Sequence, residues 1–249
     1  MSFVCERGQK LPQLLETFRG LMLDDFQKQA IFYLDQGASV FVSAPTGTGK
    51  TLIADYIIEK DFRAGKRVFY TAPIKALSNQ KYKQFKALVG EENVGIVTGD
   101  VVLNEYAPIV LMTTEIFRNM LFESPDQIQD VAHVIFDEIH YIADEERGFV
   151  WEESLIFMPE TMRFLGLSAT VSNSDQLADW MRSLRKEPIY VIKAFERIVP
   201  LQHRFFSPET GIASRKRILN YYYQHIEEYE GGAGGLRTRR QFHLARPAH

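Results

Sequence analysis

Residues 39 to 51 of this chain read SVFVSAPTGTGKT, and this stretch decides which kind of fold the chain forms. The apolar segment Ser39 to Ser43 runs directly into a loop with two glycines, and Thr51 to Glu59 then suits a helix. The loop fits the phosphate-loop pattern with Ala44 in place of the first glycine, followed by four residues and then Gly49-Lys50-Thr51. An ordinary strand-to-helix turn is the alternative. The strand before the loop and the helix after it favour the phosphate loop, because that loop requires this context.

The residue types of the loop suit nucleotide binding. Glycines let backbone N–H groups close around phosphate oxygens, Lys50 adds positive charge at the β- and γ-phosphates, and Thr51 offers a hydroxyl to Mg²⁺. The sequence therefore predicts a nucleotide site, with Mg²⁺ as its metal, whose contacts come from Thr46, Gly47, Thr48, Gly49, Lys50 and Thr51.

The composition is that of a globular protein. The chain has 249 residues, of which 45% are hydrophobic and 24% charged, so it can bury a sizeable core. The longest apolar runs, such as Ala107 to Met112, are too short to span a bilayer, and Met1 to Lys10 lacks an apolar signal region. A single cysteine, Cys5, excludes an internal disulfide framework and fits a reducing compartment. We therefore expect a soluble, cytoplasmic protein with no membrane partner.

The net charge of −3 does not indicate a protein that binds nucleic acid through an overall positive charge. Binding of RNA or DNA would have to use a local patch or backbone amides. Charge alone therefore decides little about function.

Short apolar runs alternate with helical patterns from Ser39 to Ile192, which predicts a parallel sheet covered by helices. Ligands should then gather at the carboxyl edge of that sheet. The remaining expected strands are Arg67 to Thr71, Val94 to Thr98, Ile109 to Thr113, Val131 to Phe136, Phe164 to Ser168 and Ile189 to Ile192. The remaining expected helices are Ala76 to Leu88, Thr114 to Phe122, Trp151 to Phe157 and Asp175 to Ser183.

The two ends of the chain differ from this core. Residues 1–37 carry a helical segment, Asp24 to Leu34, that we expect to pack beside the sheet. After Ala194 the alternation stops, and Ile212 to Glu230 has the pattern of one polar helix. Residues 231–249 are glycine-rich and then basic, which is the composition of a linker or of a non-native or disordered tail. We place them outside the fold.

A second group of candidate residues follows the apolar run that ends at Phe136. Asp137 and Glu138 come directly after it, and His140 follows. Asp137 suits the binding of Mg²⁺, and Glu138 suits the role of general base for the attacking water. Such a pair can also be a solvated helix start, where acids are favoured. The phosphate loop upstream favours catalytic roles for Asp137, Glu138, His140 and Lys50.

A third group ends the strand expected at Phe164 to Ser168. Ser168 and Thr170 can hydrogen-bond to the carboxylates or to His140, and so couple the site to the γ-phosphate. The alternative is a simple Ser/Thr helix cap.

Taken in order, these three groups resemble motifs I, II and III of the superfamily-two DExH-box helicases. Residues 71–80 resemble motif Ia, residues 98–100 motif Ib and residues 112–121 motif Ic. Residues 141–153 are similar to the superkiller-type RNA helicases that feed RNA to the exosome. The resemblance implies a three-layer, RecA-like P-loop domain over residues 38–195, with a mostly parallel sheet flanked by helices and with ATP and Mg²⁺ as cofactors.

The resemblance also implies individual contacts. Gln27 matches the glutamine that reads adenine. The resemblance assigns contacts with the backbone of single-stranded RNA to Pro73, Lys75, Gly99, Asp100, Thr113, Thr114 and Arg118. Each has a structural alternative: the threonines can cap the following helix, Gly99 and Asp100 can form a turn, and Lys75 can be a surface charge. Lys81, Lys83 and Lys86 fit a solvated helix face.

The implied activity is that of an ATP-dependent RNA helicase, with an RNA-decay complex as partner. Helicases of this superfamily carry catalytic arginines on a second RecA-like domain, whose motifs do not occur in this sequence, and residues 196–230 resemble the linker toward it. We therefore expect the isolated chain to bind nucleotide weakly and to hydrolyse it little. A DNA helicase of the same superfamily and a non-catalytic nucleotide-binding scaffold module remain open.

Overall fold

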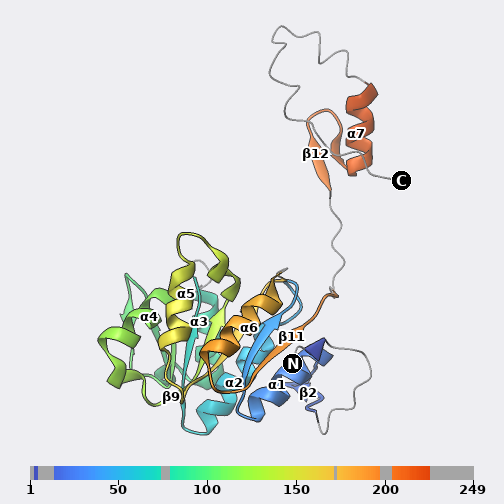
Figure 1. The fold of residues 1–249 in the computed structure, drawn as a ribbon. Coiled ribbons are helices and arrows are strands. Elements are labelled where there is room, and N and C mark those ends of the chain that lie inside the picture. The colour runs from blue at the N-terminus through green and yellow to red at the C-terminus, as the bar shows by residue number, and fades with distance from the viewer. Residues whose placement is uncertain (1–2, 5–13, 74–78, 171–172, 197–203, 225–249) are drawn as a thin grey trace. The chain divides into compact units, whose positions relative to one another are not determined.

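The computed structural model describes residues 3–4, 14–73, 79–170, 173–196 and 204–224. The chain forms two compact units, Met1–Val199 and Pro200–His249. Figure 1 shows that the first unit is a sheet with helices on both of its faces. The predicted α/β class is confirmed.

The first unit is built on a nine-stranded sheet in which every neighbouring pair is parallel except the last, β6 and β7. All seven strands expected from the sequence are present in it. The two additional strands, β1 and β7, are only two residues long, which is too short to leave a pattern in the sequence. The order across the sheet is β1 (Phe3–Val4), β11 (Ile189–Lys193), β4 (Ser39–Ser43), β10 (Arg163–Ser168), β9 (Val131–Asp137), β5 (Arg67–Thr71), β8 (Ile109–Met112), β6 (Val94–Val97) and β7 (Val102–Leu103).

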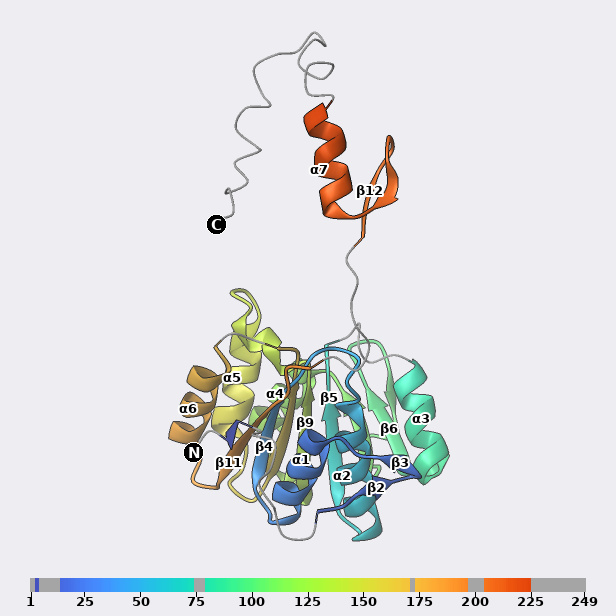
Figure 2. The ribbon, with the colours of Figure 1, turned by 90° about the vertical axis from the view of Figure 1, so that its right-hand side faces the viewer.

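Helices cover both faces of this sheet, which makes the three layers that the resemblance implied. One face packs against α1 (Asp25–Asp35), α2 (Thr51–Arg63) and α3 (Asn79–Val89), as Figure 2 shows. The other packs against α4 (Thr114–Glu123), α5 (Gly148–Phe157) and α6 (Ser174–Leu184). Short 3-10 helices connect several elements: η1 (Glu91–Asn93), η2 (Pro125–Ile128) and η3 (Ile139–Ala143).

The core consists of two hydrophobic clusters, one on each side of the sheet. Alternate residues of one strand enter different clusters: Val40 and Val42 of β4 pack toward α1 and α2, whereas Phe41 packs toward the opposite helices. Side chains of a strand alternate between faces, so a strand buried on both faces reads as a continuous apolar run. This explains why the sequence predicts β4 correctly.

The N-terminal segment adds a small hairpin that the sequence did not predict. Strands β2 (Thr17–Phe18) and β3 (Leu21–Met22) pair antiparallel. Their connection uses Arg19 and Gly20, which have φ values of 50° and 75°. Two successive positive φ values are typical of the tight turns that join hairpin strands.

The second unit corrects one expectation. Instead of one helix over Ile212 to Glu230, strand β12 (Phe205–Ser207) pairs antiparallel with β13 (Gly211–Ala213), and α7 spans Arg215–Gln224. The helix begins later than predicted because Gly211, with φ of 63°, closes the hairpin, and the Ser214 hydroxyl caps the helix by accepting from the Arg217 N–H at 3.3 Å. Residues 225–230 and the predicted tail 231–249 lie outside the described residues.

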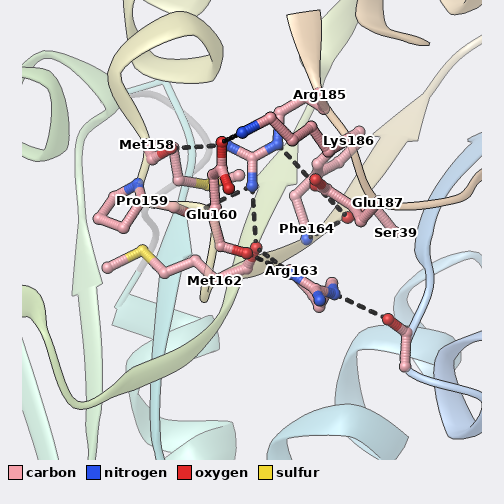
Figure 3. Close-up of polar contacts among 11 residues, drawn as sticks. Ser39, Met158, Pro159, Glu160, Met162, Arg163, Phe164, Arg185, Lys186 and Glu187 are labelled. Carbon is pink, nitrogen blue, oxygen red and sulfur yellow. Dashed lines mark hydrogen bonds and ion pairs between the residues drawn. The ribbon is translucent and has the colours of Figure 1, made fainter.

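The amino edge of the sheet is fastened by a buried polar network around Arg185, just after α6 (Figure 3). Its guanidinium donates to the carbonyls of Met158, Pro159 and Met162 at 2.6, 3.1 and 3.0 Å. It also pairs with Glu187 at 2.6 Å. The network joins the ends of α5 and α6 to the starts of β10 and β11, and leaves the carboxyl edge free for loops.

Within the described part of the chain, each helix is too short or too polar to cross a bilayer.

Candidate active site

The phosphate loop lies between β4 and α2, at the carboxyl edge of the sheet. Gly47 and Gly49 have φ values of 85° and 79°, a region that L side chains rarely adopt. A Cβ atom at Gly49 would lie 2.9 Å from the Gln27 side-chain nitrogen, whereas one at Gly47 would meet nothing within 4 Å. The loop is therefore closed by protein at Gly49 and open at Gly47.

Lys50 and Thr48 shape the interior of this loop. The Lys50 ammonium donates to the carbonyls of Ala44 at 2.6 Å and Pro45 at 3.0 Å, and the Thr48 hydroxyl donates to the Pro45 carbonyl at 2.8 Å. Thr51 is the first residue of α2, and no side chain caps this helix start. An uncapped helix N-terminus carries backbone N–H groups and a partial positive charge that suit an anion. These donors together fit the phosphates of a nucleotide.

Gln27 braces the loop from α1. Its side chain is buried, with 4% exposed. The amide oxygen accepts from the Asp24 backbone N–H at 2.8 Å in a capping box, and the amide nitrogen donates to the Gly49 carbonyl at 3.0 Å. Both ends of the amide thus bond to the protein itself. A contact with adenine stays a prediction. The spacing of Asp24 and Gln27, three residues apart, is the sequence signal of the capping box.

Asp137 ends β9, and only β10 separates that strand from β4, so Asp137 and the phosphate loop occupy the same edge of the sheet. Its carboxylate is held on both oxygens. Oδ1 accepts from the Glu138 backbone N–H at 3.1 Å, and Oδ2 accepts from the Tyr70 hydroxyl. The Lys81 ammonium lies 3.8 Å from Oδ2.

Glu138 occupies the left-handed region, with φ of 57° and ψ of 39°. Such a conformation in a residue other than glycine is uncommon and costs energy that the surrounding structure must offset. Glu138 directly precedes η3 as its N-cap residue, so the helix-start alternative describes the local backbone. The same turn places the Glu138 carboxylate 3.2 Å from Nδ1 of His140. The structure thus brings these two predicted residues together.

Tyr70 and Lys81 belong to this site, although neither was a candidate from the sequence. Burial, and then the Asp137 carboxylate, raise the pKa of Tyr70 well above its ordinary value, so its hydroxyl stays protonated. Burial lowers the pKa of Lys81. The expectation of a solvated face was wrong for Lys81, which turns inward, but right for the exposed Lys83. Lys86 pairs with Glu91.

Ser168 is the last residue of β10 and Thr170 follows it, but Ser168 makes a different hydrogen bond from the one expected. The Ser168 hydroxyl donates to the Ala169 carbonyl at 2.7 Å, and not to Asp137 or His140. The helix-cap alternative also fails, because α6 starts only at Ser174 with Asn173 before it. Ser168 is buried between β4 and β9, whereas Thr170 is exposed. A coupling role for either residue stays a prediction.

The predicted RNA contacts come from loops that follow the neighbouring strands β5, β8 and β6. Gly99 and Asp100 are exposed in the turn between β6 and β7, where the Thr98 N–H donates to the Val101 carbonyl at 2.7 Å. Pro73 is buried, and Lys75 lies outside the described residues.

Thr113 and Arg118 have structural partners, whereas the buried Thr114 hydroxyl has no hydrogen-bond partner among the described residues. Thr113 caps α4, since its hydroxyl accepts from the Ile116 N–H at 3.4 Å, and Thr114 is fully buried. The Arg118 guanidinium pairs with Glu153 at 2.6 Å. The capping alternative therefore describes Thr113, and Arg118 would have to leave Glu153 to reach a nucleic acid.

Comparison with known sequences agrees with this arrangement. Residues 24–177 match the family described as DEAD/DEAH box helicase. The chain is 45% identical to antiviral helicase SKI2 of Saccharomyces cerevisiae over 84% of its length, which is 16% of SKI2. It is 50% identical to human superkiller complex protein 2 over 77% of this chain and 15% of that protein. It is 48% identical to human exosome RNA helicase MTR4 over 74% of this chain and 18% of that protein. The chain thus spans less than a fifth of each.

Solved structures share the fold. The helicase Lhr of Mycobacterium smegmatis, bound to ssDNA and AMP-PNP, matches with a TM-score of 0.54 and 24% identity over 68% of this chain and 25% of that one. The UvsW helicase of bacteriophage T4 matches with a TM-score of 0.52 and 18% identity over 74% of this chain and 64% of that one. At these identities the likeness establishes a helicase RecA-like fold alone. The sequence match over residues 24–177 shows that the chain belongs to the DEAD/DEAH box helicase family.

Proposed function

We propose that this chain is the ATP-binding half of an ATP-dependent RNA helicase, which couples ATP hydrolysis to movement along RNA and to unwinding. The observation that carries the proposal is the shared position of two groups: the phosphate loop after β4 and the Asp137-Glu138 pair after β9 lie at one edge of the sheet, with only β10 between their strands. This is where a parallel sheet presents its ligand-binding loops.

Each residue then has a defined task. The backbone of residues 46–49 and the Lys50 ammonium hold the phosphates. Mg²⁺ prefers oxygen ligands and is commonly held by one or two protein groups plus phosphates, so the Thr51 hydroxyl and the Asp137 carboxylate fit it chemically. When bound, this ion neutralises charge on the phosphates.

Glu138 is the candidate general base. Its carboxylate stands at the start of η3 and accepts the proton of the attacking water, and His140 Nδ1 lies 3.2 Å from it. Replacing Glu138 by Gln removes the base and keeps the shape of the side chain.

RNA is the substrate that the relatives favour, since MTR4 is named an exosome RNA helicase and SKI2 an antiviral helicase. The loops after β5, β6 and β8 offer the contacts, with Pro73, Lys75, Gly99, Asp100, Thr113, Thr114 and Arg118 as the residues. We extend the proposal to a second RecA-like domain, an RNA-decay complex and a cytoplasmic location. Ser168 and Thr170 are proposed to couple the site to the γ-phosphate, and Gln27 to select adenine.

The experiment that tests nucleotide binding is a titration with a fluorescent ATP analogue. Lys50→Ala is expected to weaken binding roughly tenfold or more, because a charge-assisted hydrogen bond contributes about 1.5–3 kcal/mol. Lys66→Ala, which alters an exposed lysine in the turn after α2, is the matched control and should leave affinity unchanged. Equal affinity in Lys50→Ala would remove the proposed site.

Two further measurements separate the alternative functions. Competition between RNA and DNA single strands of the same sequence should favour RNA, because DNA lacks the 2′-OH. Preference for DNA would instead support a DNA helicase. The structure of Lhr, which shares this fold, contains ssDNA. A non-catalytic, nucleotide-binding scaffold module would bind ATP but neither RNA nor DNA.

A further inference from the structure

Tyr70 places a hydroxyl from the protein core against the candidate metal ligand. The residue lies in β5, between β8 and β9, and its side chain is fully buried. The ring packs edge-on against Phe85 of α3, with 5.3 Å between ring centroids. Its hydroxyl donates to Oδ2 of Asp137. A rigidly packed ring therefore presents a single polar atom to the edge of the sheet where nucleotide is proposed to bind.

Lys81 fixes the direction of that hydroxyl proton. The residue stands in the first turn of α3, and its ammonium donates to the Tyr70 oxygen at 2.5 Å and lies 4.7 Å from the centre of the Tyr70 ring. An ammonium group can only donate, so the Tyr70 oxygen accepts from Lys81 and its own proton is left for Asp137. The order of donation is thus Lys81 to Tyr70 to Asp137.

The Asp137 carboxylate is consequently held by two donors at once. Oδ1 accepts from the Glu138 N–H at 3.1 Å, while Oδ2 accepts from Tyr70. A carboxylate bound in this way has lost its freedom to rotate before any ion arrives. Partners behind a metal ligand that fix its orientation generally strengthen metal binding.

We propose that Tyr70, supported by Lys81, is a positioning residue that holds the Asp137 carboxylate in the orientation in which it receives the Mg²⁺ of a magnesium–nucleotide complex. This inference rests on the proposed function, because it assumes that Asp137 serves a nucleotide site. It adds two residues, on β5 and α3, to a site otherwise made by the loops after β4 and β9. A purely structural role for Tyr70 is the competing explanation.

Tyr70→Phe tests the proposal, since it deletes the hydroxyl and leaves the packed ring. Binding of fluorescent ADP to the 249-residue chain would be measured against increasing Mg²⁺ and, separately, in EDTA. We expect the Mg²⁺ concentration for half-maximal binding to rise about tenfold or more, in line with the loss of an outer partner of a metal ligand. Affinity in EDTA should stay unchanged.

Two controls frame this result. Tyr56→Phe also deletes a tyrosine hydroxyl that bonds to an aspartate, Asp35, but in a contact between α2 and the end of α1 that lies outside the proposed site, and it should leave the Mg²⁺ requirement unchanged. Asp137→Asn should remove most of the Mg²⁺ dependence.

The outcomes are separable. An unchanged Mg²⁺ requirement in Tyr70→Phe, with Asp137→Asn defective, would overturn the inference and leave the proposed function intact. Equal weakening of Tyr70→Phe with Mg²⁺ and in EDTA would show a structural role and also overturn it. Mg²⁺-independent binding by the unaltered chain would overturn the proposed function itself.

Discussion

Gly49 is the residue of the phosphate loop with the least room for a side chain. Its φ is 79°, and an added Cβ would lie 2.9 Å from the Gln27 amide nitrogen. We predict that Gly49→Ala lowers the free energy of unfolding by about 1–2 kcal/mol through the left-handed backbone. It should also weaken nucleotide binding, because Gln27 must move. Urea unfolding and a nucleotide titration would measure the two effects.

Gly65 provides the matched control for backbone strain. It has φ of 69°, and an added Cβ would meet nothing within 4 Å. Gly65→Ala in the turn after α2 should therefore destabilise the fold by a similar amount without changing nucleotide affinity. If both variants bound nucleotide like the unaltered chain, the contact between Gly49 and Gln27 would have no part in the site.

At the scale of elements, Arg185 connects more of the fold than any motif residue does. The side chains of Arg185 and Glu187 are only 3% and 4% exposed. We predict that Arg185→Met lowers the free energy of unfolding by about 3–5 kcal/mol, because it leaves Glu187 as a buried charge without its partner. Chemical denaturation followed by circular dichroism would measure the loss.

The neighbouring Lys186 distinguishes this network from an ordinary ion pair. Lys186 is 82% exposed and pairs with Glu160, which is 67% exposed. Lys186→Met should change stability by less than about 1 kcal/mol. Similar losses in the Arg185 and Lys186 variants would mean that burial adds nothing to the Arg185 contacts.

Asp55 connects α2 to α3 and to the β2–β3 hairpin. Its Oδ2 accepts from Gln84 at 2.9 Å and from Arg19 at 3.2 Å. Burial raises the pKa of Asp55 above its ordinary value of 3.8, although Arg19 opposes the shift. As the pH rises, Asp55 therefore loses its proton in the unfolded chain before it does so in the folded one. The free energy of unfolding falls as the pH rises through the window from the unfolded-state pKa of Asp55 to its folded-state pKa.

Asp55→Asn is therefore expected to gain stability relative to the unaltered chain as the pH rises through that window, and to keep the gain at neutral pH. The Asn oxygen can still accept from Gln84 and Arg19. Urea unfolding of both proteins from acidic to neutral pH would test the sign. A deficit of Asp55→Asn that grew with pH would show that the Arg19 pair outweighs desolvation.

At the scale of the whole molecule, nucleic-acid binding should be weak. The chain has a net charge of −3, and the proposed contacts include only two cations, Lys75 and Arg118. For single strands each neutralised phosphate contributes about −0.7 to the slope of log affinity against log salt, so we expect a slope of no more than about −1.4. Fluorescence anisotropy with a labelled RNA would measure it. A much steeper slope would reveal a basic surface outside the proposed set.

The isolated chain should also hydrolyse ATP slowly. Catalytic arginines supplied from outside a phosphate-loop domain contribute about 10³ to 10⁵ in rate. Steady-state ATPase with and without single-stranded RNA would test this. Robust, RNA-stimulated turnover that disappears in Glu138→Gln would contradict the expectation that a second domain is needed.

The strands and the phosphate loop were predictable because their signals are local. Five consecutive buried residues make β4, and the loop after it is recognised by its residue spacing between that strand and the following helix. Asp137 and Glu138 were found for the same reason, since they directly follow a buried strand. The late start of α7 was missed because Gly211–Ala213 pairs with β12 as strand β13, so the first residues of the helix predicted from Ile212 form a hairpin instead.

The sequence by itself determined the class of fold, the positions of the main strands along the chain and the loops that carry the candidate chemistry, because each depends on neighbours within a few residues. Only the tertiary structure decided what holds that chemistry in place. The Tyr70 hydroxyl meets Asp137 across 67 positions of the chain, and Ser39 meets Glu187 across 148. Such contacts follow from the order of strands in the sheet and from side-chain packing, and no local pattern records them.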